Sequence, residues 1–365
     1  MTVGIVGGGQ LGRMLALAGY PLGLDFLFLD RAADTPGGQV APILCGELTD
    51  PTLLSQLAER SDVVTFDWEN ISVDALLTLK GTKICPPIRA LAAAQDRVSE
   101  KQLFERLRIP TTRWRNVESK EHLLEAAKQV GLPGVIKTRR MGYDGKGQAV
   151  VRTAADLERA WGELGSVPLL YEDLVPFERE VSVIGVRGRR GEIAVYPLND
   201  NVHSQGILRL TRAPYGSVKL QRLAAQYLKR VLEYFRYVGV LTIEFFVRGG
   251  ALIANEMAPR VHNSGHWTIE GAATSQFENH LRAIVGLPLG STRALGHSAM
   301  LNLIGKMPPA ARLLTHEGLH LHDYGKAPRP GRKLGHCTFV EGNPRARDIR
   351  ARRLLAELAP AIRIP

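Results

Sequence analysis

The sequence is poor in cysteine and has no long apolar run. Its three cysteines, Cys45, Cys85 and Cys337, lie far apart with no CxxC pair, which excludes a disulfide framework or a cysteine zinc site and suits a reducing cytoplasm. No apolar stretch approaches the roughly 18 residues that a membrane span needs. No basic leader precedes the strand-like run at residues 2–6, so we expect neither a membrane anchor nor a secretory signal.

Several catalytic signatures are missing as well. The sequence has no GxSxG segment, no Cys/His nucleophile arrangement, no GKS or GKT phosphate loop and no internal repeat. What is present is a chain of 365 residues, 45% apolar and 23% charged, which is the composition of a globular protein. Its length predicts roughly two to three domains.

Positive charge is in excess. Lysine and arginine number 47 against 36 acidic residues, a net charge of +11, which predicts anionic partners such as nucleic acid, phosphorylated metabolites or lipid headgroups. The one dense basic run, residues 345–353, alternates at helical spacing with Ile349, Leu354, Leu355 and Leu358. We interpret it as a solvated helix face in preference to an RNA-binding tail.

Strand and helix patterns alternate in the first third of the chain. Strands are expected at 3–6, 25–29 and 63–66, with helices at 11–18 and 53–59, a rhythm that predicts a parallel sheet. A small α/β segment follows, and strand patterns from about residue 173 onward favour antiparallel pairing. We therefore expect four regions, at residues 1–95, 96–172, 173–296 and 297–365.

A glycine-rich turn at residues 7–12 fits the pattern GxGxxG between a strand and a helix. Such a turn lets the backbone approach a phosphate at a helix N-terminus. Asp30 follows 18 residues after Gly12, near where a dinucleotide enzyme keeps its ribose-binding acid. On this motif alone, nicotinamide binding and simple strand–helix packing are equally favoured.

A second glycine-rich loop follows the strand at 134–137, which ends in Lys137. The loop carries three glycines and three further basic side chains, those of Arg139, Arg140 and Lys146. Backbone amides and cations of this kind suit a triphosphate, so we favour phosphate binding over a mobile hairpin tip.

Glu244 and Glu256 flank a turn at residues 249–250. A two-residue turn alone sets Glu244 opposite Asn255, whereas an odd-length loop or a glycine bulge sets it opposite Glu256. Only the second register places both carboxylates on one face, about 4.5–5.5 Å apart at Cβ. Mg²⁺ would relieve their repulsion, and we favour this metal site over a solvent-facing glutamate.

Polar residues crowd the segment at 258–267, directly after the second glutamate. Arg260, His262, Asn263 and Ser264 could donate hydrogen bonds to an anionic or polyhydroxyl substrate, or simply form a polar turn. The segment at 171–175 followed by Glu180 could hold a base and a ribose, which is a weaker indication. Residues 201–203 and 332–336 would by themselves count as surface loops.

Taken in order, these motifs resemble an ATP-grasp ligase. Five segments resemble the family of 5-(carboxyamino)imidazole ribonucleotide synthases in particular: GGGQLGRM (7–14), TRRMGYDGKGQ (138–148), PLNDNVHSQGILRL (197–210), NEMAPRVHNSGHWT (255–268) and RKLGH (332–336). The resemblance implies an ATP-grasp fold with an N-terminal Rossmann-like parallel-sheet domain, a small α/β lid and a C-terminal antiparallel-sheet domain. The region at 297–365 is then a strand-rich cap.

The resemblance also implies a site for ATP and Mg²⁺. Metal ligands would be Glu244 and Glu256. The nucleotide-binding residues that it implies are Arg97, Lys137, Gly142, Tyr143, Asp144, Gly145, Lys146, Gly147, Gln148, Glu172, Asp173, Leu174, Val175, Glu180, His203, Asn255 and Glu256.

Aminoimidazole ribonucleotide and bicarbonate are the substrates that the resemblance implies. The residues expected to hold them are Gln10, Leu11, Tyr143, Arg260, His262, Asn263, Ser264, Arg332 and Lys333. It further implies catalytic roles for Asp144, Lys146 and His262, a cytoplasmic homodimer, and no nucleic-acid or membrane partner. Asp144 and His262 both remain open as the acceptor of the substrate's amine proton.

The chain departs from the family pattern at two positions, where Met141 replaces a loop glycine and Asp67 replaces a glutamate. In addition, Ala258 stands where many ATP-grasp enzymes have asparagine. Rival interpretations are a formate-using transformylase, a biotin carboxylase, an NAD(P) oxidoreductase and a basic RNA-binding module. The oxidoreductase gives no reason for the Glu244/Glu256 pair.

Overall fold

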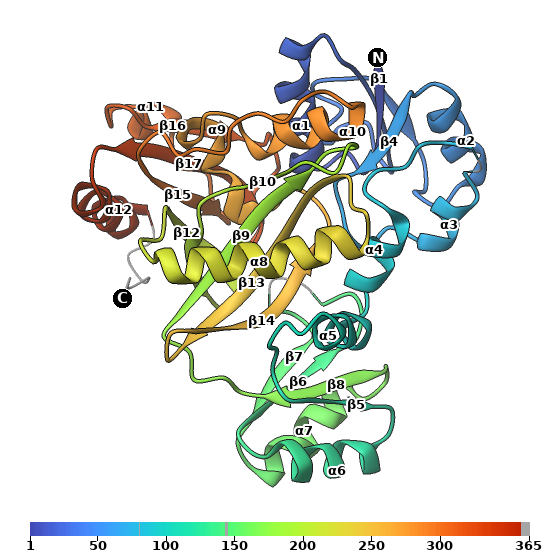
Figure 1. Ribbon diagram of the computed structural model, residues 1–365, viewed down its shortest axis with the longest axis vertical. Coiled ribbons are helices and arrows are strands. Elements are labelled where there is room, and N and C mark those ends of the chain that lie inside the picture. Colours follow the sequence, from blue (N-terminus) through green and yellow to red (C-terminus); the bar gives the residue numbers. More distant parts are fainter. Residues whose placement is uncertain (80, 143–144, 359–365) are drawn as a thin grey trace.

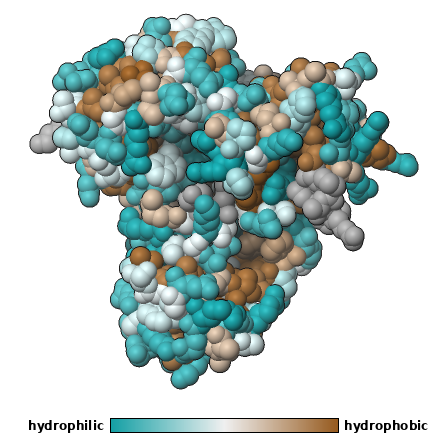
Figure 2. Space-filling view, turned by 180° about the vertical axis from the view of Figure 1, so that it is seen from behind, coloured by the Kyte–Doolittle hydropathy of each residue, from teal (hydrophilic) through white to brown (hydrophobic). Residues whose placement is uncertain are grey.

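The computed structural model describes residues 1–79, 81–142 and 145–358. Within these residues three β-sheets form the framework, and helices cover their faces (Figure 1). Figure 2 shows the same arrangement from behind, as one lower lobe joined to two upper lobes with a largely hydrophilic surface. None of the described helices is long and apolar enough to cross a membrane.

The N-terminal sheet is parallel, with strand order β3-β2-β1-β4. This confirms the parallel sheet predicted from the alternating strand and helix patterns. Its elements are β1 (Thr2–Val6), α1 (Gln10–Gly19), η1 (Tyr20–Leu22), β2 (Asp25–Asp30), β3 (Ile43–Cys45), α2 (Pro51–Glu59), β4 (Val63–Phe66), α3 (Val73–Leu77) and α4 (Ile88–Ala94).

The lower lobe in Figure 1 is built on a small antiparallel sheet of order β5-β8-β6-β7. Leu123 of α6 and Leu157 of α7 pack with Ile136 and Tyr171 of the sheet, because their helices present one apolar face to it. The elements are α5 (Arg97–Arg106), β5 (Trp114–Val117), α6 (Lys120–Val130), β6 (Gly134–Thr138), β7 (Gln148–Val151), α7 (Ala154–Leu164) and β8 (Leu169–Asp173).

The large sheet is antiparallel, with order β14-β13-β9-β11-β12-β15-β17-β16 and β10 paired to β9. The expected cap at 297–365 therefore adds its strands to this same sheet, because β15 pairs with β12. The strands are β9 (Arg179–Arg187), β10 (Ile193–Val195), β11 (Asn199–Ser204), β12 (Ile207–Ala213), β13 (Gly239–Arg248), β14 (Ala251–Ala258), β15 (His297–Ile304), β16 (His320–Asp323) and β17 (Lys333–Glu341).

Helices on the large sheet join it to the other layers. α8 packs Leu228 and Val231 onto Ile243 and Phe245 of β13, whereas α10 belongs to an apolar cluster shared with α1 and β2 of the N-terminal sheet. The helices of this part are α8 (Val218–Tyr234), η2 (Asn263–Gly265), α9 (Thr268–Gly271), α10 (Gln276–Val285), α11 (Ala310–Leu313) and α12 (Pro344–Leu358).

The basic run near the C-terminus lies in α12, but its buried face differs from the predicted one. Ile349 is 58% exposed, whereas Arg347 is only 7% exposed and donates to the carbonyl of Pro214 at 3.3 Å. Leu354 and Leu355 are buried, as the periodicity predicts. The helix is thus a packed part of the cap, and the exposure of Arg345, Arg352 and Arg353 confirms that a solvated basic face is present.

Candidate active site

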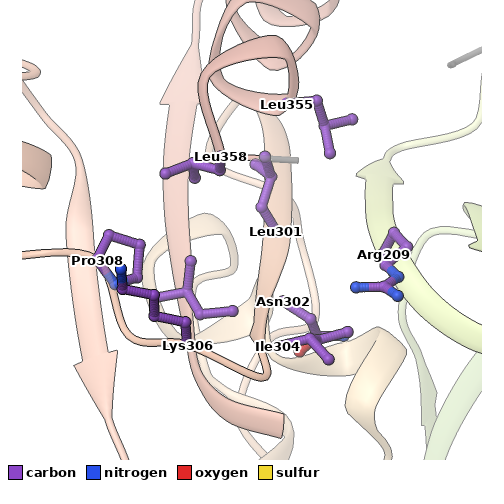
Figure 3. Close-up of a pocket in the computed structure, with 9 residues that line it drawn as sticks. Arg209, Leu301, Asn302, Ile304, Lys306, Pro308, Leu355 and Leu358 are labelled. Carbon is purple, nitrogen blue, oxygen red and sulfur yellow. The ribbon is translucent and has the colours of Figure 1, made fainter. Parts of the chain in front are cut away.

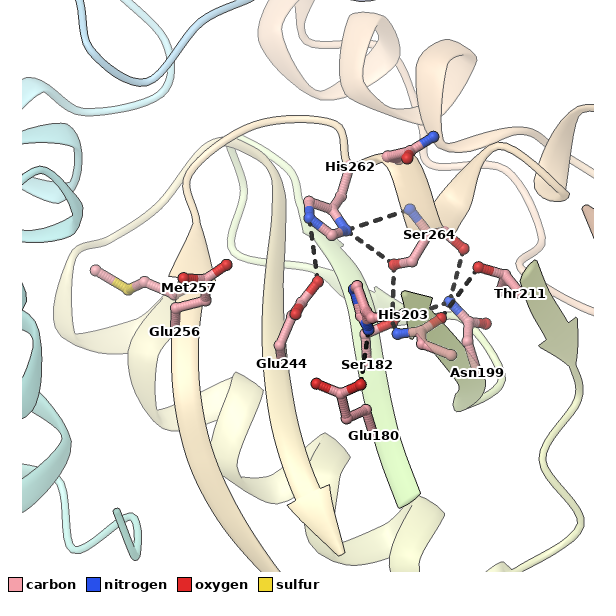
Figure 4. A network of polar contacts seen from close by, with 12 residues as sticks. Glu180, Ser182, Asn199, His203, Thr211, Glu244, Glu256, Met257, His262 and Ser264 are labelled. Atoms are coloured by element: carbon pink, nitrogen blue, oxygen red, sulfur yellow. Dashed lines mark hydrogen bonds and ion pairs between the residues drawn. The ribbon is translucent and has the colours of Figure 1, made fainter. Parts of the chain in front are cut away.

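The two acidic residues of the β13–β14 hairpin are direct partners across the strands, as Figure 4 shows. The turn at 249–250 has two residues, which alone would pair Glu244 with Asn255. The register shifts just beyond Phe245, where Asn255 bulges out of β14, so Glu244 pairs with Glu256. The register that places both carboxylates on one face is confirmed, although its cause is a bulge at an asparagine instead of a glycine.

Glu244 lies among other acidic groups. Burial, together with the charges of Glu256 and Glu180, raises its pKa to about 7 against the opposing charge of His203. Glu256 lies on the outer strand β14, and the guanidinium of Arg97 from α5 approaches its Oε2 at 3.3 Å. The pair is therefore only partly neutralised by the side chains around it.

This donor set fits a hard divalent cation, because carboxylate oxygens are the ligands that Mg²⁺ prefers. Within 1–79, 81–142 and 145–358, no group of three or more His, Cys, Asp or Glu side chains is arranged to hold a metal. Two carboxylates would thus need further oxygens from a phosphate or from water, as is usual for Mg²⁺ at nucleotide sites.

Glu180 and His203 lie beside this pair and contact each other. His203 Nδ1 is 2.8 Å from Glu180 Oε2. Burial lowers the pKa of His203, but the hydrogen bond to Glu180 and the charges of Glu244, Glu180 and Glu256 outweigh it and raise the pKa to about 9. The structure therefore brings together two residues that were predicted on the nucleotide side, and His203 carries positive charge at neutral pH.

A buried ionic cluster supports Lys137 at the end of β6. Glu172 of β8 forms ion pairs with Lys137 and with Lys101 of α5, the second at 3.0 Å, and accepts from Thr112 Oγ1 at 2.5 Å. Burial raises the pKa of Glu172, yet the charges of Lys101 and Lys137 outweigh it and hold the pKa well below its usual range. Burial also lowers the pKa of the Lys137 ammonium.

The side chain of Glu172 is occupied by this cluster. It is 2% exposed and paired with the two lysines, and the adenine contact predicted for this residue stays a prediction. Its neighbours Leu174 and Val175 leave the sheet towards β9, and Asp173 Oδ1 accepts from the backbone N–H of Arg113 at 2.9 Å. Leu174 donates its own N–H to the carbonyl of Pro133 at 3.2 Å.

The glycine-rich loop between β6 and β7 reaches towards the large sheet. A Cβ placed on Gly145, whose φ is +76°, would lie 3.1 Å from the Cα of Gly206 in the β11–β12 turn. Three other predicted nucleotide-binding residues, Gly142, Lys146 and Gly147, belong to the same connection, and Gln148 begins β7. Tyr143 and Asp144, predicted at the reacting groups, lie outside the described residues.

Two basic residues of this loop, which were predicted to suit a phosphate, form ion pairs with Asp96. Arg139 and Arg140 both pair with Asp96, at 2.7 and 3.2 Å, and Asp96 also caps the N-terminus of α5. The ion pairs therefore hold the loop against α5. Because Arg97 directly follows Asp96, the same contacts help to place Arg97 beside Glu256. Met141 adopts φ +64°, a left-handed conformation that explains why glycine suits this position.

Carboxylates fill the space around the N-terminal glycine turn. A Cβ on Gly7 would clash with Asp67 Oδ1, and the N–H of Gly8 donates to Asp30 Oδ2 at 2.5 Å. Burial raises the pKa of Asp67 to about 7, and the charge of Asp30 adds to the shift while the N–H of Gly12 opposes it. The glycines of the turn therefore allow the two carboxylates to approach the backbone closely, and Asp30 accepts one of its N–H groups.

Cations approach the start of α1 from the cap. Lys326 donates to Gln10 Oε1 at 3.2 Å, and Leu11 is buried beneath. Burial, together with the charges of Arg332 and Lys333, lowers the pKa of Lys326 to about 8. The structure thus gathers the predicted Gln10, Arg332 and Lys333 around one basic site, which suits a phosphate.

The residues of the segment at 260–264 are partly or fully buried. Arg260 forms an ion pair with Glu69 of the N-terminal unit. Asn263 and Asn302 exchange two amide hydrogen bonds, at 3.0 and 2.7 Å. Ser264 is fully buried and its hydroxyl lies 2.8 Å from His262 Nδ1, while the substrate contact predicted for it stays a prediction.

His262 is the member of this segment that faces the carboxylate pair. Its Nε2 lies 3.3 Å from Glu244 Oε1. Burial lowers the pKa of His262 well below its usual value, and the charge of Arg260 adds to this. The imidazole is therefore neutral at physiological pH.

A small cavity of about 40 Å³ lies elsewhere, between β15 and α12 (Figure 3). Leu301, Leu355 and Leu358 line it with Arg209. Asn302 also lines it and connects it to Asn263, but none of the predicted site residues in the described part of the chain does so itself.

Sequence reasoning missed three residues of this site. Lys101 follows Arg97 by one helical turn, a spacing that places both on one face of α5 and could have indicated it. Lys326 stands in a basic stretch of the cap, and Ser182 follows Glu180 by two positions in β9, where its hydroxyl lies 2.8 Å from that of Ser264. Neither of these two has a sequence signal that names its partner.

Comparison with known families covers most of the chain. Residues 1–95 match a ribonucleotide synthetase preATP-grasp domain, and residues 102–277 match an ATP-grasp domain. Residues 298–350 match a phosphoribosylaminoimidazole carboxylase C-terminal domain.

Individual relatives agree with these matches. The chain is 52% identical over 340 residues to N5-carboxyaminoimidazole ribonucleotide synthase of Pseudomonas aeruginosa, covering 93% of this chain and 94% of the relative. The crystal structure of the synthetase from Thermus thermophilus superposes with a TM-score of 0.95 at 52% identity over the full length of both chains. The synthase of Aspergillus clavatus, solved with ADP and 5-aminoimidazole ribonucleotide, gives a TM-score of 0.92 at 31% identity, covering 99% of each chain.

Proposed function

The chain belongs to the N5-carboxyaminoimidazole ribonucleotide synthase family of ATP-grasp enzymes, and on that premise we propose how its residues carry out the ATP-dependent conversion of 5-aminoimidazole ribonucleotide to the N5-carboxylated product in purine biosynthesis. The observation that carries the proposal is the Glu244/Glu256 pair, which faces the Lys137 cluster across Asn255. Lys137 Nζ lies 3.5 Å from Asn255 Oδ1, so lid and large sheet meet at the bulge.

In this proposal ATP lies between the lid and the large sheet. Lys137 and Arg97 contact its phosphates, the loop at 142–148 covers them, and Glu180 with His203 holds the ribose side. Glu172 positions Lys137 through their ion pair. Leu174 and Val175, at the start of the connection to β9, contact the adenine.

Glu244 and Glu256 would hold Mg²⁺, which when bound supplies charge neutralisation for the transferring phosphoryl group. The fit rests on their shared face and on the raised pKa of Glu244. Ala258 provides no amide ligand at the position where many ATP-grasp enzymes have asparagine, so the two carboxylates are the protein's contribution.

Bicarbonate is the carbon source in this proposal. An oxygen of bicarbonate attacks the γ-phosphorus, the bond to ADP breaks, and carboxyphosphate forms. Carboxyphosphate then releases phosphate and CO₂, and the exocyclic amine of the ribonucleotide adds to CO₂ and loses a proton. Arg260 and His262 hold the anionic oxygens, while loop closure excludes water from the intermediate.

The substrate ribonucleotide binds where the N-terminal turn meets the cap. The basic residues around Gln10, namely Lys326, Arg332 and Lys333, hold its phosphate. Their proximity to one another and to the N-terminus of α1 supports this placement.

ADP release tests the proposed function. Purified protein with ATP, Mg²⁺ and bicarbonate should release ADP and phosphate, and aminoimidazole ribonucleotide should stimulate that release. Glu256→Gln should abolish it, because half of the ligand charge is lost. Near-normal turnover of this variant would reject the metal assignment, and stimulation by formate or biotin in place of the ribonucleotide would reject the substrate.

We also propose a cytoplasmic homodimer. Support for the location comes from the three free cysteines of the described chain, and the dimer is expected from the family. Light scattering of the purified protein should give a mass twice that of the chain. A mass equal to one chain at micromolar concentration would reject the dimer.

A further inference from the structure

Two groups of Ser264 lie within hydrogen-bond distance of His262 Nδ1, and one of them can only donate. The backbone N–H of Ser264 points at His262 Nδ1 from 3.3 Å, and the Ser264 hydroxyl lies 2.8 Å from the same nitrogen. A backbone amide has no acceptor capacity, so Nδ1 carries no proton. The hydroxyl must then donate to Nδ1 as well.

The donor direction continues into the core behind Ser264 (Figure 4). Ser182 Oγ lies 2.8 Å from Ser264 Oγ. Because the Ser264 proton points to His262, Ser182 must donate its own proton to Ser264. Ser182 Oγ is in turn the acceptor for two amide groups, Asn201 Nδ2 at 2.9 Å and Asn199 Nδ2 at 3.3 Å.

The indole of Trp267 fixes the direction of the hydrogen bonds at the far end of this series. Trp267 Nε1 donates to Asn199 Oδ1 at 2.8 Å, and an indole nitrogen is a donor only. Asn199 must therefore turn its amide nitrogen towards Ser182. Thr211 donates to Asn201 Oδ1 at 3.0 Å, which is consistent with the same direction. Ser182, Asn199, Ser264 and Trp267 are all fully buried, so water does not compete for these bonds.

We propose that this buried relay, running from Trp267 through Asn199, Ser182 and Ser264, holds His262 as the Nε2–H tautomer and makes it a hydrogen-bond donor towards the reacting oxygens. Nε2 points to Glu244 Oε1 at 3.3 Å, an acceptor at the end of the relay. Every bond between the indole and the carboxylate then runs in one direction. Ser182, Asn199 and Ser264 are positioning residues, because they act through His262.

The inference rests on the proposed function for its chemical meaning. With Nδ1 occupied and Nε2 carrying a proton, neither nitrogen of His262 is free to accept the proton of the substrate amine. His262 instead donates to an oxyanion such as bicarbonate or carboxyphosphate. The amine proton goes to another group, for which Asp144 is the remaining candidate among the two considered.

Nitrogen NMR of the resting protein tests the tautomer without any turnover. The protein is labelled with ¹⁵N-histidine, and the His262 signals are identified by their loss in His262→Gln. The expected spectrum shows an unprotonated, acceptor-type Nδ1 and a protonated Nε2. A protonated Nδ1, or rapid averaging of both tautomers, would overturn the proposal. If the labelled wild type gives the expected spectrum but releases no ADP, the proposed function fails and the tautomer stands.

Two substitutions of His262 test its role as a donor. Glutamine places an amide N–H near the position of Nε2 but does not accept a proton at neutral pH. We expect His262→Gln to keep kcat within about tenfold of wild type, whereas His262→Ala loses more. A loss of about 10²–10⁴-fold in both variants, the range for removal of a general base, would overturn the donor assignment.

The relay itself is tested by Ser182→Ala against a matched control. Ser298→Ala also removes a buried hydroxyl from the large sheet, and in the described part of the chain Ser298 Oγ has no hydrogen-bond partner. We expect Ser182→Ala to lower kcat about tenfold with KM for ATP unchanged, and Ser298→Ala to leave both unchanged. Equal effects of the two substitutions on kcat would overturn the relay.

Discussion

Removal of the Lys101 charge should weaken both the fold and ATP binding, although Lys101 touches no proposed ligand. Its ammonium is 2% exposed and lies 3.0 Å from Glu172 Oε2 and 2.9 Å from Thr111 Oγ1. In Lys101→Met the carboxylate of Glu172 keeps only Lys137 as a charged partner. Lys137 is then held more tightly by Glu172 and is less available to a phosphate.

The size of the effect follows from the burial of the cluster. Breaking a buried ion pair by removal of one partner costs about 3–5 kcal/mol. Because Lys137 and Thr112 still contact Glu172, we expect the lower end, about 3 kcal/mol in the free energy of unfolding. The exposed pair Lys229–Glu233, at 3.6 Å, is the matched control, and Lys229→Met should cost less than about 0.5 kcal/mol.

Urea unfolding at pH 7 measures both variants, with KM for ATP measured in parallel. Because the folded-state pKa of Glu172 lies below its unfolded value, its contribution is present above about pH 4 and is lost as the pH falls further. The difference between wild type and Lys101→Met should narrow accordingly below about pH 4. An effect of Lys101→Met no larger than that of Lys229→Met would refute the reasoning.

Three further predictions concern the turn, the loop and the helix cap. The pKa of Asp67 is raised to about 7 in the folded state, so ionisation of Asp67 lowers the stability of the fold as the pH rises from about 4 to 7. In Asp67→Asn the melting temperature should fall less over this pH range, as measured by thermal melts. Met141→Val should cost about 1–2 kcal/mol in urea unfolding, because a β-branched residue is disfavoured at φ +64°, whereas Met141→Gly should be nearly neutral. Asp96→Ala removes a helix cap and the anchor of Arg139 and Arg140; it should cost about 1–2 kcal/mol and raise KM for ATP, and an unchanged KM would contradict the anchoring role.

The part of the site that could be predicted from the sequence is the part whose residues lie close together along the chain. Glu244 and Glu256 flank a glycine turn, and that pattern limits their pairing to two registers. The choice between the registers depends on Asn255, which leaves the ladder so that its side chain reaches Lys137 in another sheet. A contact of this kind is set by packing between lobes and has no local sequence signal.

Charge in a loop was a less reliable guide. Arg139 and Arg140 have the composition of a phosphate site, but Asp96, more than 40 positions earlier, pairs with both. The glycines at 7–12 likewise gave no sign of their partner, because Asp67, which follows β4, lies against Gly7 and Gly9. In each case the partner comes from a distant part of the chain, and only the fold reveals it.

The extra residue in β14 has a consequence for how this hairpin tolerates changes in length. Phe245 pairs with Ala254 and Glu244 with Glu256, so a chain shortened by Asn255 alone would place the same two glutamates opposite each other in an uninterrupted ladder. What such a chain loses is the amide oxygen that meets Lys137. Carboxylate pairing and the contact between Lys137 and Asn255 are therefore separable by a single codon.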